Sequence, residues 1–267
     1  MPQAEVNGTT LHYRLEGPEA GPVIMMAHSL MSTLHMWDPQ ISALTEAGFR
    51  VLRYDSRGHG QSAVPEGPYS IDMLADDAIG LMDSLGFDQA HFCGLSKSGM
   101  VGQNLGARFG NRLISLILCD TASQVPPPSM WDERIAMVRA QGMRGFADAT
   151  IDRWFTKPVQ QRLPDQVAAV RKLIVTTPVE GFCACSEAMR DMDQRETIRK
   201  IATPTLVIVG EHDLVTPVEA ARFIHERIAG SRLVIISDAA HFCNIEQPGP
   251  FNEALLGFLR AQGGVTK

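Results

Sequence analysis

Six short apolar segments, each followed by a helical or loop segment, restrict the possible folds more than any other feature of the sequence. They occur at residues 23–27, 51–54, 91–95, 113–118, 205–210 and 233–236. A nearly continuous apolar run of this length is typical of a strand that is buried on both faces, as in a parallel sheet. The alternation of such strands with helices predicts an α/β protein with a mostly parallel central sheet and helices on both faces.

The first residues predict an antiparallel pair beside this sheet. The segment AEVNGTTLHYRLEG alternates in polarity on both sides of Asn7-Gly8, a dipeptide that suits the positive φ angles of a type I′ turn. Ser70 is a candidate cap for a helix that runs to about residue 85, and small residues at 97–109 predict a helix packed closely on the sheet. Thr216, Pro217 and Glu219 form a candidate capping box for a helix between the last two strands.

The alternation stops between residues 124 and 199. Pro126, Pro127 and Pro128 interrupt the chain there, and helical patterns follow at residues 131–141, 146–154 and 164–176. We therefore expect residues 1–123 and 200–267 to form one core, with residues 124–199 inserted as a helical lid.

Charge and hydropathy exclude several classes of protein. The net charge of -6 and the scattered lysines and arginines argue against a nucleic-acid interface. No apolar run approaches the roughly 18 residues of a membrane span. The start of the chain, MPQAEVNGTT, lacks the basic and apolar regions of a secretion signal. A cytoplasmic protein that acts on a small molecule is expected.

The cysteines predict neither a disulfide framework nor a metal site. The five cysteines are an odd number at irregular spacings, which favours reduced thiols. Cys183 and Cys185 are close in sequence, but no second close pair of thiols or histidines accompanies them, so we interpret them as packing residues.

The segment HFCGLSKSGM contains a candidate nucleophile. A nucleophile elbow reads G-x-S-x-G; Gly94 and Ser96 fit, while Ser98 stands in the fifth position and Gly99 follows it. The motif needs small residues because a helix packs tightly on a strand at this turn, and serine is small enough. A phosphate-binding loop with the spacing of GLSKSG would need lysine where Met100 stands. Ser96 is therefore the predicted nucleophile.

A serine nucleophile needs a base to take its proton and an acid to orient that base. Asp213 follows the strand at 205–210 and His241 follows the strand at 233–236, so the order along the chain is Ser, Asp, His. Each residue alone could be an ordinary turn or surface group, but together they predict a catalytic triad. Asp120, at the end of the strand at 113–118, is the rival acid. It is less favoured because the loop that holds Asp213 directly precedes the strand and loop that deliver His241.

An oxyanion hole requires two backbone amides near the nucleophile. The amide of Lys97 directly follows Ser96, and the amide of Leu30, in the loop after residues 23–27, is the candidate second donor. The side chain of Lys97 is expected in solvent, with attraction of an anionic substrate as the alternative. His59 is expected to pack its glycine-rich loop.

Several segments resemble known families. The elbow, YDSRGHGQS, VGEHDLVTP and HFCNIEQPGPF resemble the α/β-hydrolase superfamily. The lid segments TPVEGFCACSEAMRDMDQR and MWDERIAMVRAQGMRGFADATIDRWFT resemble the 3-oxoadipate enol-lactonases. The likeness runs nearly end to end. It implies an α/β-hydrolase fold and hydrolysis, without cofactor, of the enol-lactone of 3-oxoadipate in aromatic catabolism.

The departures from the family pattern cluster around the predicted site. Met31 stands where the family usually has glycine, Lys97 and Ser98 replace an apolar residue and glycine, and Phe242 replaces leucine. In the lid, Trp131 and Arg134 are candidates for closing the pocket, and an arginine can hold a substrate carboxylate through two hydrogen bonds. Both residues could equally belong to the helix core and surface.

Three functional hypotheses follow. The first is a serine hydrolase that cleaves a small lactone or carboxylic ester through an acyl-enzyme. A promiscuous carboxylesterase or a C–C bond hydrolase is the alternative within the same class. A non-catalytic ligand-binding protein of this fold is the alternative from another class, and the complete set of Ser96, Asp213 and His241 argues against it.

Overall fold

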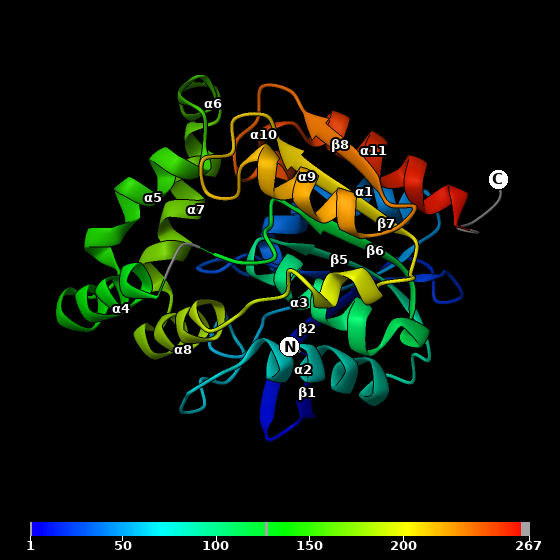
Figure 1. Ribbon diagram of the computed structural model, residues 1–267, viewed down its shortest axis with the longest axis horizontal. Helices are drawn as coiled ribbons and strands as arrows, with labels where there is room; N and C mark the ends of the chain where they lie inside the picture. The colour runs from blue at the N-terminus through cyan, green and yellow to red at the C-terminus, as the bar shows by residue number, and fades with distance from the viewer. Residues whose placement is uncertain (1, 126–127, 263–267) are drawn as a thin grey trace.

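An eight-stranded sheet forms the centre of the computed structural model, which describes residues 2–125 and 128–262 (Figure 1). The strand order is β1-β2-β4-β3-β5-β6-β7-β8. β1 pairs antiparallel with β2 and β2 pairs antiparallel with β4, whereas all later neighbours are parallel. The strands are β1 (Gln3–Val6), β2 (Thr9–Glu16), β3 (Val23–Ala27), β4 (Arg50–Tyr54), β5 (Ala90–Leu95), β6 (Leu113–Cys119), β7 (Thr205–Gly210) and β8 (Arg232–Ile236).

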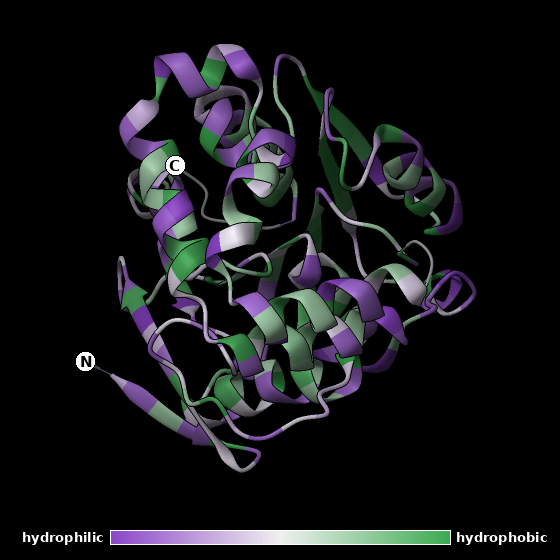
Figure 2. Cartoon of the chain, turned by 90° about the vertical axis from the view of Figure 1, so that its left-hand side faces the viewer, coloured by the Kyte–Doolittle hydropathy of each residue, from purple (hydrophilic) through white to green (hydrophobic). Residues whose placement is uncertain are grey.

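The predicted α/β class and mostly parallel sheet are confirmed. Every residue of β3, β5 and β7 is buried, as expected for strands that helices cover on both faces. Figure 2 shows the interior strands mainly in the hydrophobic colour, while the helices mix hydrophobic and hydrophilic residues. Asn7 and Gly8 have φ angles of 44° and 72°, so the predicted hairpin turn is also confirmed.

Helices cover both faces of the sheet. α1 and α11 pack together on one face and α2 packs against α3 on the other. Ser70 Oγ accepts a hydrogen bond from the amide of Met73 at 3.0 Å, as predicted for the cap of α2. The core helices are α1 (Asp38–Glu46), α2 (Ile71–Ser84), α3 (Lys97–Arg108), α9 (Val218–Arg227), α10 (Cys243–Glu246) and α11 (Pro248–Ala261), with 3₁₀ turns η1 (Leu34–Trp37), η2 (Gly110–Arg112) and η4 (Thr197–Lys200).

The predicted capping box of α9 is wrong. α9 begins after Pro217 and has no side-chain cap. The hydroxyl of Thr216 donates instead to Oδ2 of Asp213 at 2.8 Å. A buried carboxylate is a stronger acceptor than a neutral partner, so it holds the hydroxyl that the capping box would have used.

Helices α4–α8 lie together on one side of the sheet, at the left of Figure 1, and we call them the lid. Two of them, α6 and α8, were not predicted. Pro126 and Pro127, which were expected to interrupt the chain before the lid, lie outside the described residues. The lid consists of α4 (Ser129–Gln141), η3 (Arg144–Phe146), α5 (Ala147–Trp154), α6 (Lys157–Arg162), α7 (Pro164–Thr176) and α8 (Val179–Arg190).

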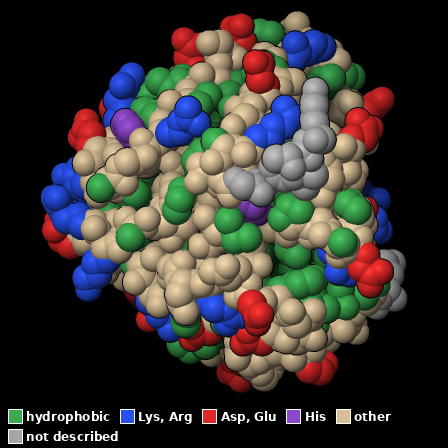
Figure 3. All heavy atoms as spheres, turned by 90° about the vertical axis from the view of Figure 1, so that its right-hand side faces the viewer, with side chains coloured by type: hydrophobic (Ala, Val, Ile, Leu, Met, Phe, Trp, Pro, Cys, Tyr) green, Lys and Arg blue, Asp and Glu red, His purple; other side chains and the backbone are tan. Residues whose placement is uncertain are grey.

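The surface carries mixed charge on the face that Figure 3 shows. Acidic and basic side chains are interspersed there with apolar ones, and the basic side chains are not gathered in one patch.

No helix within residues 2–125 and 128–262 has both the length and the apolar character needed to cross a bilayer.

The lid packs closely against the core where Gly181 of α8 meets Gly58 of the loop after β4. A Cβ added at Gly181 of α8 would lie 1.9 Å from the carbonyl oxygen of Gly58, and a Cβ added at Gly58 would lie 2.7 Å from Cα of Gly181. In each case the atom that the added Cβ would meet belongs to the backbone, which cannot rotate away as a flexible side chain could. Only glycine therefore permits α8 to approach the loop after β4 this closely.

We expect Gly181→Ala to lower the free energy of unfolding by about 1–3 kcal/mol, because the added methyl group must push α8 away from Gly58. Urea unfolding of the two proteins measures the difference. Gly145→Ala is the matched lid control, since its Cβ would meet its nearest neighbour at 3.8 Å. Equal stability of the two variants would show that the close contact does not constrain the lid.

Candidate active site

Ser96 occupies a strained turn between β5 and α3. Its backbone angles are φ 57° and ψ −117°, a combination that costs a non-glycine residue about 1–3 kcal/mol. Two hydrogen bonds hold the turn. The amide of Ser96 donates to the carbonyl of Cys119 at 2.9 Å, and Thr121 Oγ1 donates to the carbonyl of Ser96 at 2.8 Å. The neighbouring strand β6 thus fixes the backbone of the predicted nucleophile.

The irregular elbow motif has a structural explanation. A Cβ at Gly94 would lie 2.2 Å from the carbonyl oxygen of Ser98, and a Cβ at Gly99 would lie 2.6 Å from the side chain of Thr121. The two tight positions are therefore 94 and 99. Position 98 accommodates a side chain, and Ser98 Oγ donates to the carbonyl of His28 at 2.6 Å. Ser98 thus ties α3 to the loop that follows β3.

Asp213 and His241 form a buried pair on the loops after β7 and β8. Nδ1 of His241 lies 2.8 Å from Oδ2 of Asp213, and the two side chains are 1% and 0% exposed. An ionised carboxylate can only accept, so Nδ1 carries a proton, and whenever the ring is neutral Nε2 is the acceptor. This is the tautomer that a general base requires.

Asp213 is held in its ionised form. Burial alone would raise the pKa of this carboxyl group, but the charge of the His241 ring and the hydrogen bonds from His241 and Thr216 outweigh burial and lower the pKa. Oδ1 accepts from the amides of Val215 and Thr216 at 2.7 and 3.1 Å. Thr216 was not predicted as a partner of Asp213, because its hydroxyl was expected to cap α9.

Asp120, the alternative candidate for the catalytic acid, accepts hydrogen bonds from groups other than His241. Its Oδ1 accepts from the amide of Gly210 at 2.8 Å and its Oδ2 accepts from the thiol of Cys243 at 2.9 Å. Burial raises the pKa of Asp120 well above its ordinary value, and the nearby Asp213 raises it further. A carboxyl group whose two oxygens are already engaged, and whose ionised form is disfavoured by burial, is poorly suited to stabilise a histidine cation.

A small cavity of about 50 Å³ joins the predicted residues from the core and the lid. Ser96, His241, Leu30 and Met31 line it from the core, and the predicted Trp131 and Arg134 line it from the lid. The lining also includes residues that were not predicted, Ser29 and Val215 from the core and Phe146, Thr150, Arg153, Trp154, Phe182 and Met189 from the lid.

Trp154 shows why these residues were missed. Its ring stacks on Phe242 at 4.4 Å between centroids and lies 6.0 Å from the ring of His241. The apolar pattern of α5 marked a buried face, but a single sequence does not reveal which element covers it. Here that element is the loop that carries the predicted base.

The loop after β3 presents the candidate oxyanion amide. Met31 has a φ of 59°, which explains why glycine suits this position. Its amide donates to Nε2 of His59 at 3.2 Å. Within residues 2–125 and 128–262, the amide of Leu30 has no hydrogen-bond acceptor. The amide of Lys97 is the first of α3 and has no acceptor within its own helix. Both amides proposed for the oxyanion hole are thus free to bind an oxygen.

The expectation that Lys97 extends into solvent or attracts a substrate is wrong. Its side chain is fully buried, and Nζ donates to Ser56 Oγ at 2.8 Å. It is not among the residues that line the cavity. Burial lowers the pKa of Lys97, although Cys185, Asp77 and Asp55 oppose this effect. The loop after β4 and the lid helix α8 cover the first turn of α3, and this removes the side chain from water.

Neutral histidines connect Lys97 to the loop of Leu30. The amide of Ser56 donates to Nε2 of His28 at 2.9 Å, and Nδ1 of His28 donates to the carbonyl of Ser29 at 2.7 Å. Burial, aided by Lys97, lowers the pKa of His59 to about 3 and that of His28 well below its ordinary value. His59 therefore packs its loop, as expected, and also holds Met31.

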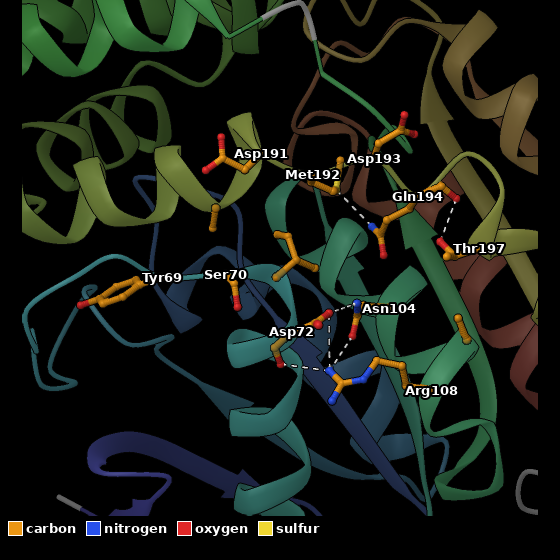
Figure 4. Close-up of a pocket in the computed structure, with 13 residues that line it drawn as sticks. Tyr69, Ser70, Asp72, Asn104, Arg108, Asp191, Met192, Asp193, Gln194 and Thr197 are labelled. Atoms are coloured by element: carbon orange, nitrogen blue, oxygen red, sulfur yellow. Dashed lines mark hydrogen bonds and ion pairs between the residues drawn. The ribbon is translucent and has the colours of Figure 1, made fainter.

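A larger and more open hollow of about 460 Å³ lies beside α2, α3 and the residues after α8 (Figure 4). Its polar side chains pair with one another: Asn104 donates to Asp72 at 2.6 Å, and Arg108 donates to the carbonyl of Asp72 at 3.3 Å. None of the predicted catalytic residues lines it. We therefore place the chemistry in the smaller cavity.

Cys183 and Cys185 are both buried, as expected for packing residues. Among the residues that the structure describes, no three His, Cys, Asp or Glu side chains gather as a set of metal ligands.

Comparisons with known proteins bear on the family and fold of the chain. The model of a family described as alpha/beta hydrolase fold matches residues 22–158, and one described as TAP-like protein matches residues 170–263. The chain is similar to 3-oxoadipate enol-lactonase 2 of Acinetobacter baylyi, with 37% identity over 92% of this chain and 91% of that protein.

A crystal structure and a second group of relatives extend the comparison. The enol-lactonase from Burkholderia xenovorans LB400 superposes with a TM-score of 0.95 and 42% identity, covering 97% of this chain and 100% of that one. A putative carbamate hydrolase, RutD of Variovorax paradoxus, is 29% identical over 93% of this chain and 96% of its own length.

We expect Lys97→Met to stabilise the protein at pH 7 by on the order of 1 kcal/mol, because the native fold must bury an amine that water solvates in the unfolded chain. The pKa of Lys97 is lowered on folding. Between the lowered pKa of the folded protein and the ordinary lysine pKa, the unfolded chain therefore binds more protons than the folded protein. The free energy of unfolding of the wild type consequently rises with pH in that range. The advantage of the variant should shrink between pH 7 and about 10.

Urea unfolding at a series of pH values measures this trend, and Lys172→Met, at an exposed lid lysine, is the control. A variant that is less stable than the wild type at pH 7, or an advantage that grows with pH, would contradict the expectation.

Proposed function

We propose that this chain, which belongs to the alpha/beta hydrolase family, cleaves a small lactone or carboxylic ester through an acyl-enzyme on Ser96. The chain is an ester-hydrolysing enzyme. The observation that carries the finer proposal is the buried pair of Asp213 and His241, whose histidine lines the same cavity as Ser96. The enol-lactone of 3-oxoadipate is our first substrate, since two relatives above 30% identity bear the name of that activity.

The proposed reaction has two halves. Nε2 of His241 takes the proton of Ser96 Oγ as this oxygen attacks the carbonyl carbon, and the amides of Leu30 and Lys97 bind the oxyanion. His241 then gives the proton to the leaving oxygen as the C–O bond breaks. In the second half, water attacks the acyl-enzyme with His241 as base, which releases a carboxylate and restores Ser96. In a lactone, the leaving oxygen stays attached to the acyl chain.

The lid supports this chemistry by excluding water. Trp131, Phe146, Trp154 and Phe182 give the cavity apolar walls, and Trp154 stacks close to the base. A dry site strengthens the interaction between Asp213 and the imidazolium that forms during the reaction. A cytoplasmic role in aromatic catabolism belongs to the same proposal.

Hydrolysis of a carbamate is the second candidate function. The RutD relatives favour it, and attack by Ser96 on a carbamate carbonyl would need the same groups. A panel of 3-oxoadipate enol-lactone, neutral lactones, short aryl esters and a small carbamate distinguishes the candidates by kcat/KM. The lactones and aryl esters should be hydrolysed, with the enol-lactone fastest. Turnover of the carbamate alone would replace the lactonase proposal, and turnover of none of them would refute the hydrolase proposal.

Replacing the nucleophile should abolish turnover. We expect Ser96→Ala to lower kcat by about 10⁴-fold or more, while Ser98→Ala loses only the hydrogen bond to the His28 carbonyl and keeps much of the activity. A fluorophosphonate should add one adduct, which peptide mass spectrometry would find on Ser96. An adduct on Ser98 would move the nucleophile, and the absence of any adduct would favour a ligand-binding protein.

Replacing Asp213 should lower kcat far more than replacing Asp120. Asp213→Asn removes the charge that faces His241 and reverses the hydrogen-bond preference of the ring, so we expect kcat to fall by about 10³–10⁴-fold. Asp120→Asn replaces a carboxyl group of raised pKa by a neutral amide that still accepts from Gly210, so its effect should stay within about tenfold. Initial rates on one aryl ester measure both variants. The reverse order would assign the catalytic acid to β6.

A further inference from the structure

Glu246 of α10 is a buried acid that the proposed reaction does not use, and it is 1% exposed. Its Oε2 accepts a hydrogen bond from the amide of Ala240 at 2.6 Å, and its Oε1 accepts one from the amide of Thr156 at 2.6 Å. Ala240 directly precedes His241, whereas Thr156 belongs to the lid, between α5 and α6. One carboxylate thus bridges the loop of the proposed base and the lid.

The amide on the other side of His241 also ends on the lid. The amide of Phe242 donates to the carbonyl of Trp154, the last residue of α5, at 3.3 Å. Nη2 of Arg162 on α6 donates to the carbonyl of Glu246 at 2.8 Å, and α6 and α10 lie next to each other (Figure 1). The backbone on both sides of His241 is therefore held at the junction of α5 and α6, on one side directly and on the other through Glu246.

Helix α10, which carries Glu246, is itself fixed to the core. Nδ2 of Asn244 donates to the carbonyl of Met36 at 2.9 Å, and Nε2 of Gln40 on α1 donates to the carbonyl of Asn244 at 3.0 Å. Asn244 and Gln40 are both fully buried. Glu246 therefore extends toward the two amides from a support that the core holds in place.

The two hydrogen bonds of the Glu246 side chain require an ionised carboxylate. Each oxygen faces a backbone N–H, and a protonated carboxyl group would direct its own hydrogen at one of them. Burial raises the pKa of Glu246, while the two amides, Arg162 and His212 lower it. A charge that folding must desolvate is weak evidence for a stabilising role. Its contacts instead indicate a role in holding the two segments together.

We propose that Glu246 is a positioning residue that aligns His241 for catalysis by tying its loop to the lid. The inference rests on the proposed function, because the proton transfers that need this alignment are those of the acyl-enzyme reaction. Asp213 orients the ring of His241, but the place of Nε2 relative to Ser96 also depends on the backbone at residues 240–242. Breaking either hydrogen bond of the carboxylate frees that backbone, and a displacement of about 1 Å can lower the rate about 100-fold.

Glu246→Gln breaks one half of the bridge. The amide oxygen of glutamine can accept from Ala240 or from Thr156, and its NH2 group then faces the other N–H. We expect kcat for para-nitrophenyl acetate to fall by about tenfold or more while KM changes by less than about threefold, because the lost contact acts on the base and not on the substrate.

Thr156 offers a matched pair of lid variants. Thr156→Pro removes the proton that Oε1 accepts and displaces this oxygen with a ring carbon. The backbone already suits proline, since Thr156 has a φ of −64° and Phe155 before it is extended, with φ −129° and ψ 137°. Thr156→Ala keeps the amide, and the side chain of Thr156 caps no amide of α6 in the described part of the chain.

Thr156→Pro should lower kcat as Glu246→Gln does, and Thr156→Ala should keep the wild-type kcat. The double variant of Glu246→Gln and Thr156→Pro should be no slower than the slower single variant, since both changes break the same bridge.

The proton NMR signal of Nδ1–H of His241 reports the position of the base without a substrate. This proton lies in the 2.8 Å hydrogen bond to Asp213, and His241→Gln identifies its signal by removing it. Glu246→Gln and Thr156→Pro should shift or broaden the signal, and Thr156→Ala should leave it unchanged. Thermal unfolding shows whether each variant is folded at the temperature of measurement. If Glu246→Gln is not, the two Thr156 variants decide.

The combined results separate this inference from the proposed function. An altered His241 signal in Glu246→Gln and Thr156→Pro, in a protein whose wild type hydrolyses no lactone or ester, would support the tie between Glu246 and His241 and refute the proposed function. Hydrolysis by the wild type, with both kcat and the His241 signal unchanged in the two variants, would overturn the positioning role and leave the proposed function intact.

Discussion

The left-handed backbone of Ser96 is the constraint on which the arrangement of the site depends. A serine keeps this conformation only where its surroundings impose it, and here the carbonyl of Cys119, the last residue of β6, and the hydroxyl of Thr121, just after it, do so. The strands β3, β5, β6, β7 and β8 are parallel, so the loops that follow them begin at the same edge of the sheet. β5, which carries Ser96 at its end, lies between β3 and β6. The sheet order thus brings an amide donor and the Asp213–His241 pair to one cavity.

Three of the four residues that depart from the enol-lactonase pattern, Met31, Lys97 and Ser98, converge on the loop that follows β3. Met31 donates its amide to His59, Ser98 donates its hydroxyl to the carbonyl of His28, and Lys97 reaches His28 through Ser56. This loop presents the amide of Leu30. These three departures are therefore coupled parts of one buried polar network that positions the loop, and of the three only Met31 also lines the cavity.

Features that depend on local sequence or on the order of elements could be predicted from the sequence. The six predicted strands follow from their apolar runs, and the positions of Ser96, Asp213 and His241 follow from the ends of three of them. The expected burial on both faces is wrong for β8, which lies at the edge of the sheet and has only Ile236 buried. Features that depend on contacts between distant segments could not be predicted. Lys97 is buried because it is covered by two distant segments, the loop after β4 and the helix α8. Thr216 donates a hydrogen bond to Asp213, although its local sequence resembles a helix cap. Arg153 and Trp154 line the cavity only because α5 packs over the loop of His241, a contact between distant segments.

The residues that line the cavity come from two separate parts of the chain, and this division affects how the enzyme can evolve. Ser96, His241 and the amides of Leu30 and Lys97 belong to the core, whereas Arg134, Arg153 and the four aromatic residues of the cavity wall belong to the lid. One contiguous segment of the gene thus encodes the surface that a substrate meets first. Recombination or point mutation within that segment can redirect the enzyme to a new metabolite while the inherited hydrolytic machinery remains intact.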